Sequence, residues 1–318
     1  MSKYNYSDEL RQPFGFGDFN FEKPIPLMIM RLFFSIMNAQ AKRYKVSSGL
    51  KKSIVQIQIT EETSIPCFVI EPETTLDKLP AIIYIHGGAF IGPVQRLMIQ
   101  NAAFYANALN CRVFVPEYRF APRYPFPTSL YDSYNSYEHI VENANKYNID
   151  RDKIIIYGES SGGCLAASVC HMIRDNKKHI PKAQMLIYPV TDDSLTSESM
   201  EKYKDAFWSK QASKHMWRLY LKNGDFGMKG YAAPLQNQNF NNLPPAYIEP
   251  AEIDVLRDEA IAYAEKLTSA GILIELNIIK RAYHAFDSDR NSPLTKRVLE
   301  HRLEFMKTIF KSKTNDSK

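Results

Sequence analysis

The sequence predicts an α/β protein whose core is a mostly parallel, doubly wound β-sheet flanked by helices. From residue 80 onward, short continuous apolar runs alternate with longer stretches of helical periodicity. This alternation is typical of buried parallel strands that are joined by crossover helices. A chain of 318 residues is long enough for one large α/β domain, and it contains no internal repeat that would divide it.

The predicted sheet begins with a hairpin. Ile54–Ile59 alternates apolar and polar residues, as a half-buried strand does, and Pro66–Ile70 is its expected antiparallel partner. The expected parallel strands are Ala81–Ile85, Cys111–Val115, Ile154–Tyr157, Ala183–Ile187, Ala246–Ile248 and Ile272–Leu276. Helical periodicity fits between most of them, for example at Leu130–Lys146, Gly163–Arg174 and Glu259–Ala270.

Two segments depart from this pattern. Residues 1–50 place apolar residues at helical spacing, which predicts a helical arm, and residues 192–242 predict a helical insertion within an α/β domain of residues 51–318. We expect the arm and the insertion to form a cap, whose aromatic residues are Phe14, Phe16, Phe19, Trp208 and Trp217. The alternative is that Leu27–Met37, with basic residues beside it, contacts a partner or a membrane surface.

Composition narrows the class of protein. Apolar residues make up 45% of the chain, which favours a folded globular protein over a disordered one. The 40 basic and 35 acidic residues include no basic run, so nucleic acid is not an expected partner. The four cysteines show no CxxC spacing and no grouping with histidine, which predicts reduced structural thiols and no metal site.

The N-terminal part of the sequence allows a prediction of where in the cell the protein is found. It lacks the apolar core and cleavage site of a signal peptide. The most apolar early stretch, Ile25–Met37, contains a proline and an arginine and is shorter than the roughly 20 residues that span a bilayer. We therefore expect a cytoplasmic protein without a membrane span.

One motif predicts a nucleophile. The strand Ile154–Tyr157 runs into Gly158-Glu159-Ser160-Ser161-Gly162-Gly163, and a helical stretch follows at once. A serine on such a sharp strand-to-helix turn requires small residues two positions to either side, and Gly158 and Gly162 meet that requirement. Because a shift by one would place Glu159 at a position that must be small, we predict Ser160 as the nucleophile. The backbone N–H of Ser161 is then an expected oxyanion donor.

A second motif predicts the rest of an oxyanion hole. His86-Gly87-Gly88-Ala89-Phe90 follows the strand Ala81–Ile85 directly. Consecutive glycines at a strand end allow backbone N–H groups to face an acyl carbon, so Gly87, Gly88 and Ala89 are the candidate residues. The position of His86 inside the turn suits a structural hydrogen bond better than a role as base.

These segments together resemble the hormone-sensitive-lipase-like family of α/β-hydrolases, which contains bacterial acetyl esterases and carboxylesterases. Further matching blocks are Pro116–Pro122 with Pro125–Pro127, Leu186–Pro189, Tyr231–Leu235 and Leu243–Ala246. Two differences from the family pattern stand out. Ala89 replaces the last glycine of the HGGG stretch, so that Gly88 and Ala89 would supply its amides, and GDSAGG becomes Gly158–Gly163 with a glutamate and a second serine.

A serine hydroxyl needs a general base, and histidine titrates closest to working pH. Because the chain order in this fold is serine, acid, histidine, the candidates are His215, His284 and His301. We predict His284, which follows an expected strand Ile272–Ile279 through a short loop at residues 280–283 and precedes Ala285-Phe286, similar to the family's His-Gly-Phe. Asp254 aligns with the first aspartate of the family's D-x-L-R-D block, and Glu252 is the alternative acid.

The resemblance implies a serine carboxylesterase that acts on short- to medium-chain acyl esters through an acyl-enzyme, without a metal or cofactor. Amide or formamide hydrolysis and carbohydrate deacetylation use the same groups and remain alternatives. Gibberellin receptors resemble this family without hydrolysing their ligand, but they have lost the histidine that His284 would provide here. A small-molecule ester is therefore the expected partner, and a homodimer is compatible with the family.

Overall fold

The computed structural model describes residues 3–13, 24–74 and 77–312. The expectations for Phe14, Phe16 and Phe19 lie outside the described residues. Within the described part, the main sheet has eight strands in the order β1-β2-β4-β3-β5-β6-β7-β9, and β10 and β8 form a separate two-stranded sheet. The β1–β2 and β2–β4 pairs are antiparallel and the remaining pairs of the main sheet are parallel. The prediction of a mostly parallel, doubly wound sheet is confirmed.

The strands have the following bounds: β1 (Leu50–Gln58), β2 (Ser64–Pro72), β3 (Leu79–Ile85), β4 (Arg112–Pro116), β5 (Ile149–Glu159), β6 (Ala183–Ile187), β7 (Ala246–Glu249), β8 (Ala251–Ile253), β9 (Ile274–Leu276) and β10 (Ile279–Tyr283). The helices are α1 (Pro24–Arg43), α2 (Arg96–Leu109), α3 (Thr128–Glu142), α4 (Ser161–Asp175), α5 (Glu198–Lys202), α6 (Lys210–Tyr220), α7 (Lys229–Ala232), α8 (Arg257–Ser269) and α9 (Pro293–Lys311), with short 3-10 turns η1 (Pro234–Gln236) and η2 (Phe286–Ser288).

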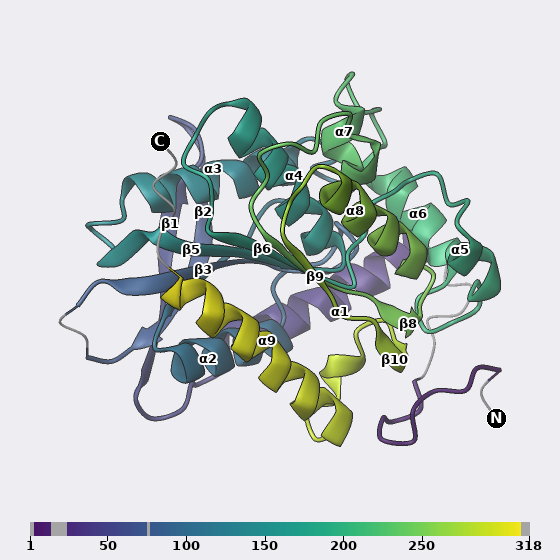
Figure 1. Ribbon diagram of the computed structural model, residues 1–318, viewed down its shortest axis with the longest axis horizontal. Coiled ribbons are helices and arrows are strands. Elements are labelled where there is room, and N and C mark those ends of the chain that lie inside the picture. Colours follow the sequence, from purple (N-terminus) through teal and green to yellow (C-terminus); the bar gives the residue numbers. More distant parts are fainter. Residues whose placement is uncertain (1–2, 14–23, 75–76, 313–318) are drawn as a thin grey trace.

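Helices cover both faces of the sheet. Figure 1 shows α2 and α9 on one face and α3, α4 and α8 on the other. The central strands are therefore buried on both sides, which explains their unbroken apolar sequences: every residue from Ile154 to Tyr157 in β5 is fully buried. At the edge of the sheet, β1 keeps its alternation, with Ile57 buried and Ile54 exposed.

One detail of the sequence prediction is wrong. The segment from Ile272 to Ile279 is not one strand, because β9 ends at Leu276 and β10 begins at Ile279. Residues 280–283, expected to be a loop, belong to β10, which pairs in parallel with β8. Isolated short strands carry too few residues for their periodicity to be read, so only the pairing of two distant segments defines them.

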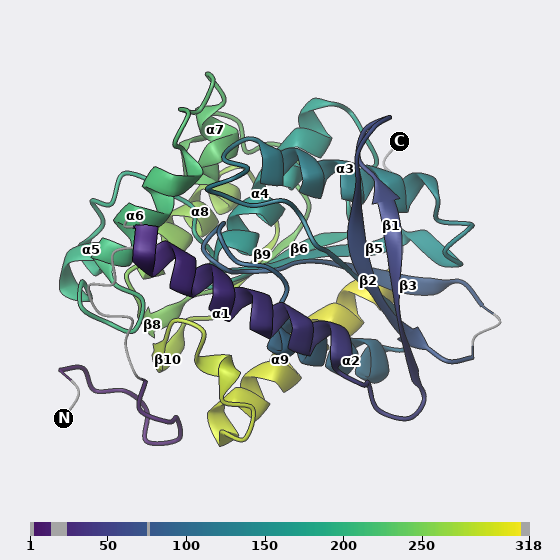
Figure 2. The ribbon, with the colours of Figure 1, turned by 180° about the vertical axis from the view of Figure 1, so that it is seen from behind.

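The helix α1 and the insertion lie on the same side of the molecule. Figure 2 shows α1 crossing the back of the molecule from α6 to α2. Asn38 of α1 donates to the backbone oxygen of Val94 at 3.0 Å and to the Glu117 carboxylate at 2.7 Å, which fastens the helix to loops of the α/β domain. The opposite face of α1 exposes apolar side chains, namely Met28, Ile29, Leu32, Phe33 and Ile36.

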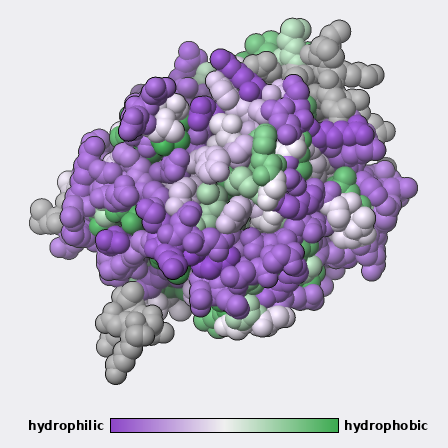
Figure 3. Space-filling view, turned by 90° about the horizontal axis from the view of Figure 1, so that it is seen from above, coloured by the Kyte–Doolittle hydropathy of each residue, from purple (hydrophilic) through white to green (hydrophobic). Residues whose placement is uncertain are grey.

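One face of the molecule has the hydrophilic surface that is ordinary for a globular domain (Figure 3). In Figure 3 the side above the sheet is mostly hydrophilic, with hydrophobic residues in small areas. No helix in the described ranges is long and apolar enough to cross a bilayer. All four cysteines are free and buried, in agreement with their expected structural role.

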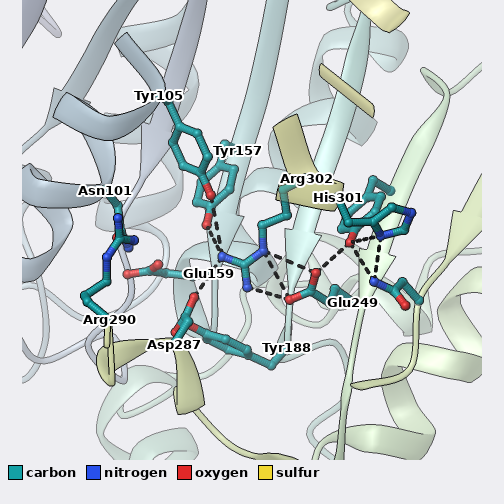
Figure 4. Close-up of polar contacts among 12 residues, drawn as sticks. Asn101, Tyr105, Tyr157, Glu159, Tyr188, Glu249, Asp287, Arg290, His301 and Arg302 are labelled. Carbon is teal, nitrogen blue, oxygen red and sulfur yellow. Dashed lines mark hydrogen bonds and ion pairs between the residues drawn. The ribbon is translucent and has the colours of Figure 1, made fainter. Parts of the chain in front are cut away.

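A buried ionic cluster joins α9 to the sheet. Arg302 of α9 is fully buried, and its Nη1 donates to Asp287 at 2.8 Å while Nε and Nη2 donate to Glu249 at the end of β7. Figure 4 shows these groups together with the hydroxyls of Tyr105 and Tyr157, which lie 3.5 Å from Arg302 Nη1. The positive charge of the Arg302 guanidinium thus balances the negative charges of carboxylates from two segments that are distant in sequence.

We expect Arg302→Met to lower the free energy of unfolding by about 3–5 kcal/mol, because it leaves buried carboxylates without their counter-charge. Urea denaturation measures this loss, which should shrink at acidic pH as the unpaired carboxyls take up protons. The matched control is Arg297→Met on the same helix. Its partner Glu9 is exposed, so the urea midpoint should not change, and equal losses in both variants would contradict the role of burial.

Candidate active site

The turn between β5 and α4 places Ser160 at the carboxyl edge of the sheet. Ser160 has φ 54° and ψ −123°, a strained conformation for a residue with a side chain. A Cβ on Gly158 would collide with the carbonyl of Gly162, and one on Gly162 would collide with the carbonyls of Ile85 and His86. The two glycines are therefore required because strand β5, helix α4 and the end of β3 meet without room for side chains.

Two short parallel strands bring an acid and a histidine together. Ile253 is the last residue of β8 and Tyr283 the last of β10, and the two lie opposite each other after a register shift between Ile279 and Tyr283. Asp254 and His284 are the next residues along each strand, so they emerge side by side at the same edge. Ala285 then turns the chain with φ 59°, the left-handed conformation that glycine adopts most readily.

The three side chains form one hydrogen-bonded chain. His284 Nδ1 lies 2.7 Å from Asp254 Oδ2, and His284 Nε2 lies 2.9 Å from Ser160 Oγ. Asp254 is 1% exposed and His284 5%, and the second carboxylate oxygen of Asp254 accepts the backbone N–H of Leu256 at 3.1 Å. A carboxylate held this way fixes one tautomer of the imidazole, with Nε2 free to accept a proton from the serine.

The other acids near Asp254 have different partners. Glu252, the alternative acid, accepts from the backbone N–H of Arg281 at 2.7 Å and pairs with Lys280. Asp258 pairs with Arg257, and Glu259 accepts the backbone N–H of Thr191 at 2.7 Å. Among these acids of the described chain, only Asp254 lies within hydrogen-bond distance of His284.

The remaining candidate histidines lie elsewhere. His301 lies 2.9 Å from Glu275 and is bonded to Asn277, while His215 contacts Gln211 on α6. His86 is buried, its Nδ1 lies 2.7 Å from the carbonyl of Gly87, and its ring stacks on Tyr118 at 4.2 Å. Burial lowers the pKa of His86 to about 4, so this imidazole stays neutral and shapes the turn.

The turn after β3 faces Ser160. Gly88 has φ 126° and Ala89 φ 56°, so both occupy left-handed conformations, and the carbonyl of Gly88 accepts the N–H groups of Ile91 and Gly92. The backbone of Gly87 differs from the other predicted donors because it makes a hydrogen bond to the Glu159 carboxyl. Gly88, Ala89 and Ser161, the first residue of α4, have no such bond among the described backbone contacts and are the remaining candidate donors.

Aromatic side chains enclose the histidine. The Tyr188 ring packs edge-on against His284 at 4.9 Å, and the Trp208 ring from the insertion lies 5.9 Å away. Tyr188 stands within the block Leu186–Pro189 of the sequence, and no local sequence signal assigns it to His284. No cluster of His, Cys, Asp or Glu able to hold a metal occurs in the parts of the chain that the structure describes.

Comparison with known proteins places this geometry in context. A profile of the alpha/beta hydrolase fold matches residues 82–288. An arylesterase of Saccharolobus solfataricus is 31% identical over 72% of this chain and 75% of that protein. The carboxylesterase NlhH of Mycobacterium tuberculosis is 30% identical over 70% and 72%, respectively. Among solved structures, a bacterial heroin esterase has a TM-score of 0.80 at 26% identity, covering 89% of this chain and 91% of that one.

We expect Gly162→Ala to destabilise the protein by at least about 2 kcal/mol, because the new methyl group would force β3 and α4 apart. Urea denaturation measures the stability. The comparison variant is Gly271→Ala, where open space surrounds the position but φ is +75°, so backbone strain alone should cost about 1 kcal/mol. A Gly162→Ala protein as stable as Gly271→Ala would contradict the close approach.

Proposed function

We propose that this chain, which belongs to the α/β-hydrolase family, is a serine carboxylesterase that cleaves short- to medium-chain acyl esters. The single observation that carries the proposal is the hydrogen-bonded chain from Asp254 through His284 to Ser160. Family membership confirms the resemblance seen in the sequence. The esterase names of the relatives support the reaction class.

In the proposed reaction, His284 Nε2 takes the proton of Ser160 as Oγ attacks the acyl carbon. The buried Asp254 carboxylate stabilises the resulting imidazolium and holds its orientation. The negative charge on the former carbonyl oxygen meets the backbone N–H groups of Gly88, Ala89 and Ser161. Ser161 is the first residue of α4, so the positive end of that helix also favours this charge. These donors tolerate alanine in place of glycine, since only the backbone is used.

The tetrahedral adduct collapses when its C–O bond to the alcohol breaks and the imidazolium gives its proton to the leaving oxygen. A water molecule then attacks the acyl-enzyme, with His284 as its base, and the acid product leaves with Ser160 regenerated. Each proton removed in one step is returned in the next, so the enzyme ends in its starting state.

We expect Ser160→Ala to lower kcat/KM for a short-chain p-nitrophenyl ester by at least ~10⁴-fold, because no other nucleophile replaces the hydroxyl. Labelling by a fluorophosphonate should disappear as well, while the urea midpoint stays close to that of the unchanged protein. Ser168→Ala, a buried serine on the same helix, is the control and should retain labelling. Substantial turnover by Ser160→Ala would refute the proposal.

We also propose that the arm (residues 1–50) and the insertion (residues 192–242) form a cap that limits the length of the acyl chain. Two contacts support this role: the Phe34 ring of α1 packs against Gly92 in the turn after β3, and Trp208 lies beside His284. Both aromatic groups therefore border the positions at which the acyl group would bind. A cap of this kind restricts length because it closes the site sterically.

Phe34→Ala should raise the preference for octanoyl over butyryl p-nitrophenyl esters by about tenfold, since it removes bulk beside the turn. The ratio of the two kcat/KM values is the measurement. Leu32→Ala, on the exposed face of the same helix, is the control and should leave the ratio unchanged. If neither substitution changes the ratio but Leu32→Ala weakens vesicle binding, α1 is a membrane-contacting arm and the cap proposal fails.

A further inference from the structure

Glu159 directly precedes the proposed nucleophile but takes no part in the acyl-transfer steps described above. Its side chain is buried, with 7% of its surface exposed. Tyr84, near the end of β3, donates its hydroxyl to Glu159 Oε2 at 2.6 Å, and the Gly87 backbone also bonds to this carboxyl. A side chain of β5 thus holds the turn that carries Gly88 and Ala89.

The same carboxyl faces the segment that carries His284. Asp287 lies three residues after His284, accepts a hydrogen bond from Tyr188 at 2.8 Å and pairs with Arg302. The Tyr188 ring in turn packs against the imidazole of His284. Figure 4 shows Glu159 close to the guanidinium of Arg302, which is ion-paired with Asp287 and Glu249. Three buried carboxyl groups therefore lie around one buried guanidinium, and two of them pair with it directly.

Resting on the proposed function, we infer that Glu159 is a positioning residue for ester hydrolysis. Its carboxylate holds Tyr84 and the Gly87 turn so that the N–H groups of Gly88 and Ala89 face the Ser160 adduct. Its charge belongs to the cluster that fixes the His284 segment through Asp287. One buried acid thereby couples the oxyanion turn to the histidine loop.

The protonation state of Glu159 decides whether this coupling holds. As a carboxylate it accepts from both Tyr84 and Gly87, whereas the protonated acid must use one oxygen as a donor and loses one of the two bonds. Burial, and then the negative charge of Asp287, raise the pKa of Glu159 to about 7. The titratable and charged groups that face it from the surrounding elements are Tyr84, Tyr118, Tyr157, Tyr188, Asp287 and Arg302.

We therefore expect the acidic side of the plot of kcat against pH to reflect the uptake of two protons. General base catalysis by itself imposes one protonation on the acidic side of the profile, and Glu159 takes up a second proton and releases the turn as pH falls. Activity should therefore fall more steeply than a single ionisation allows. A glutamate with only a structural role would leave a one-proton limb.

The test is a pair of variants, Glu159→Gln and Glu159→Asp, assayed for kcat and KM across pH. We expect Glu159→Gln to lower kcat by ~10-fold with KM within ~2-fold, because the donors are misplaced only for the adduct, and to reduce the acidic limb to one proton. Glu159→Asp keeps the charge and matches the family's GDSAGG, so it should keep the two-proton limb. Glu138→Gln, at a partly buried glutamate of α3 that pairs with Lys178, is the charge-matched control and should change neither quantity.

Tyr84→Phe tests the same contact even if Glu159→Gln fails to fold. Because the tyrosine hydroxyl stabilises the carboxylate, its removal should raise the pKa of Glu159 and shift the acidic limb to higher pH. A one-proton limb in the unchanged protein, or unchanged profiles in Glu159→Gln and Tyr84→Phe, would overturn the inference. Fluorophosphonate labelling separates the two hypotheses: unchanged profiles in a protein labelled at Ser160 refute only this inference, and absent labelling refutes the proposed function as well.

Discussion

The close approach of β3, β5 and α4 is the constraint on which the rest of the structure depends. Gly158 and Gly162 lack side chains at the point where these three elements meet, and Ser160 accepts a strained backbone as a result. Because the surrounding strands are buried on both faces, the core holds this turn rigidly. The same contact brings the turn after β3 to Ser160, so the proposed nucleophile and its candidate oxyanion donors are products of one packing arrangement.

Two further structural features, both from the C-terminal half of the chain, position the other residues of the site. The β8–β10 pair aligns Asp254 with His284, and the Arg302 cluster holds the segment that follows His284. A buried guanidinium that lost its partners would be costly, so α9 cannot shift without disturbing this segment. The C-terminal helix, far from Ser160 in sequence, therefore contributes to the geometry of the site through electrostatics rather than through contact with a substrate.

Much of the fold and of the candidate site can be predicted from local sequence patterns. The unbroken apolar run before Gly158, the glycine spacing around Ser160 and the glycine-rich turn at His86 are short-range features, because each reflects the conformation of a few consecutive residues. The expected helices do not include α2 between β3 and β4, and residues 280–283 of β10 are predicted as a loop. The roles of Glu159 in holding Gly87 and of Tyr188 beside His284 were missed for the same reason, since their partners are set by tertiary packing.

By itself, the sequence determined the α/β class, the strands of the main sheet and the turn that presents Ser160, since burial on two faces and tight turns leave a direct record in residue type and spacing. Only the tertiary structure decided which acid meets His284. Glu252, Asp254 and Asp258 lie within a few residues of one another. The pairing of Ile253 with Tyr283 directs Asp254 toward the imidazole, while Glu252 meets Lys280 and Arg281. That choice depends on the direction in which each side chain leaves a folded strand, which spacing along the chain does not encode.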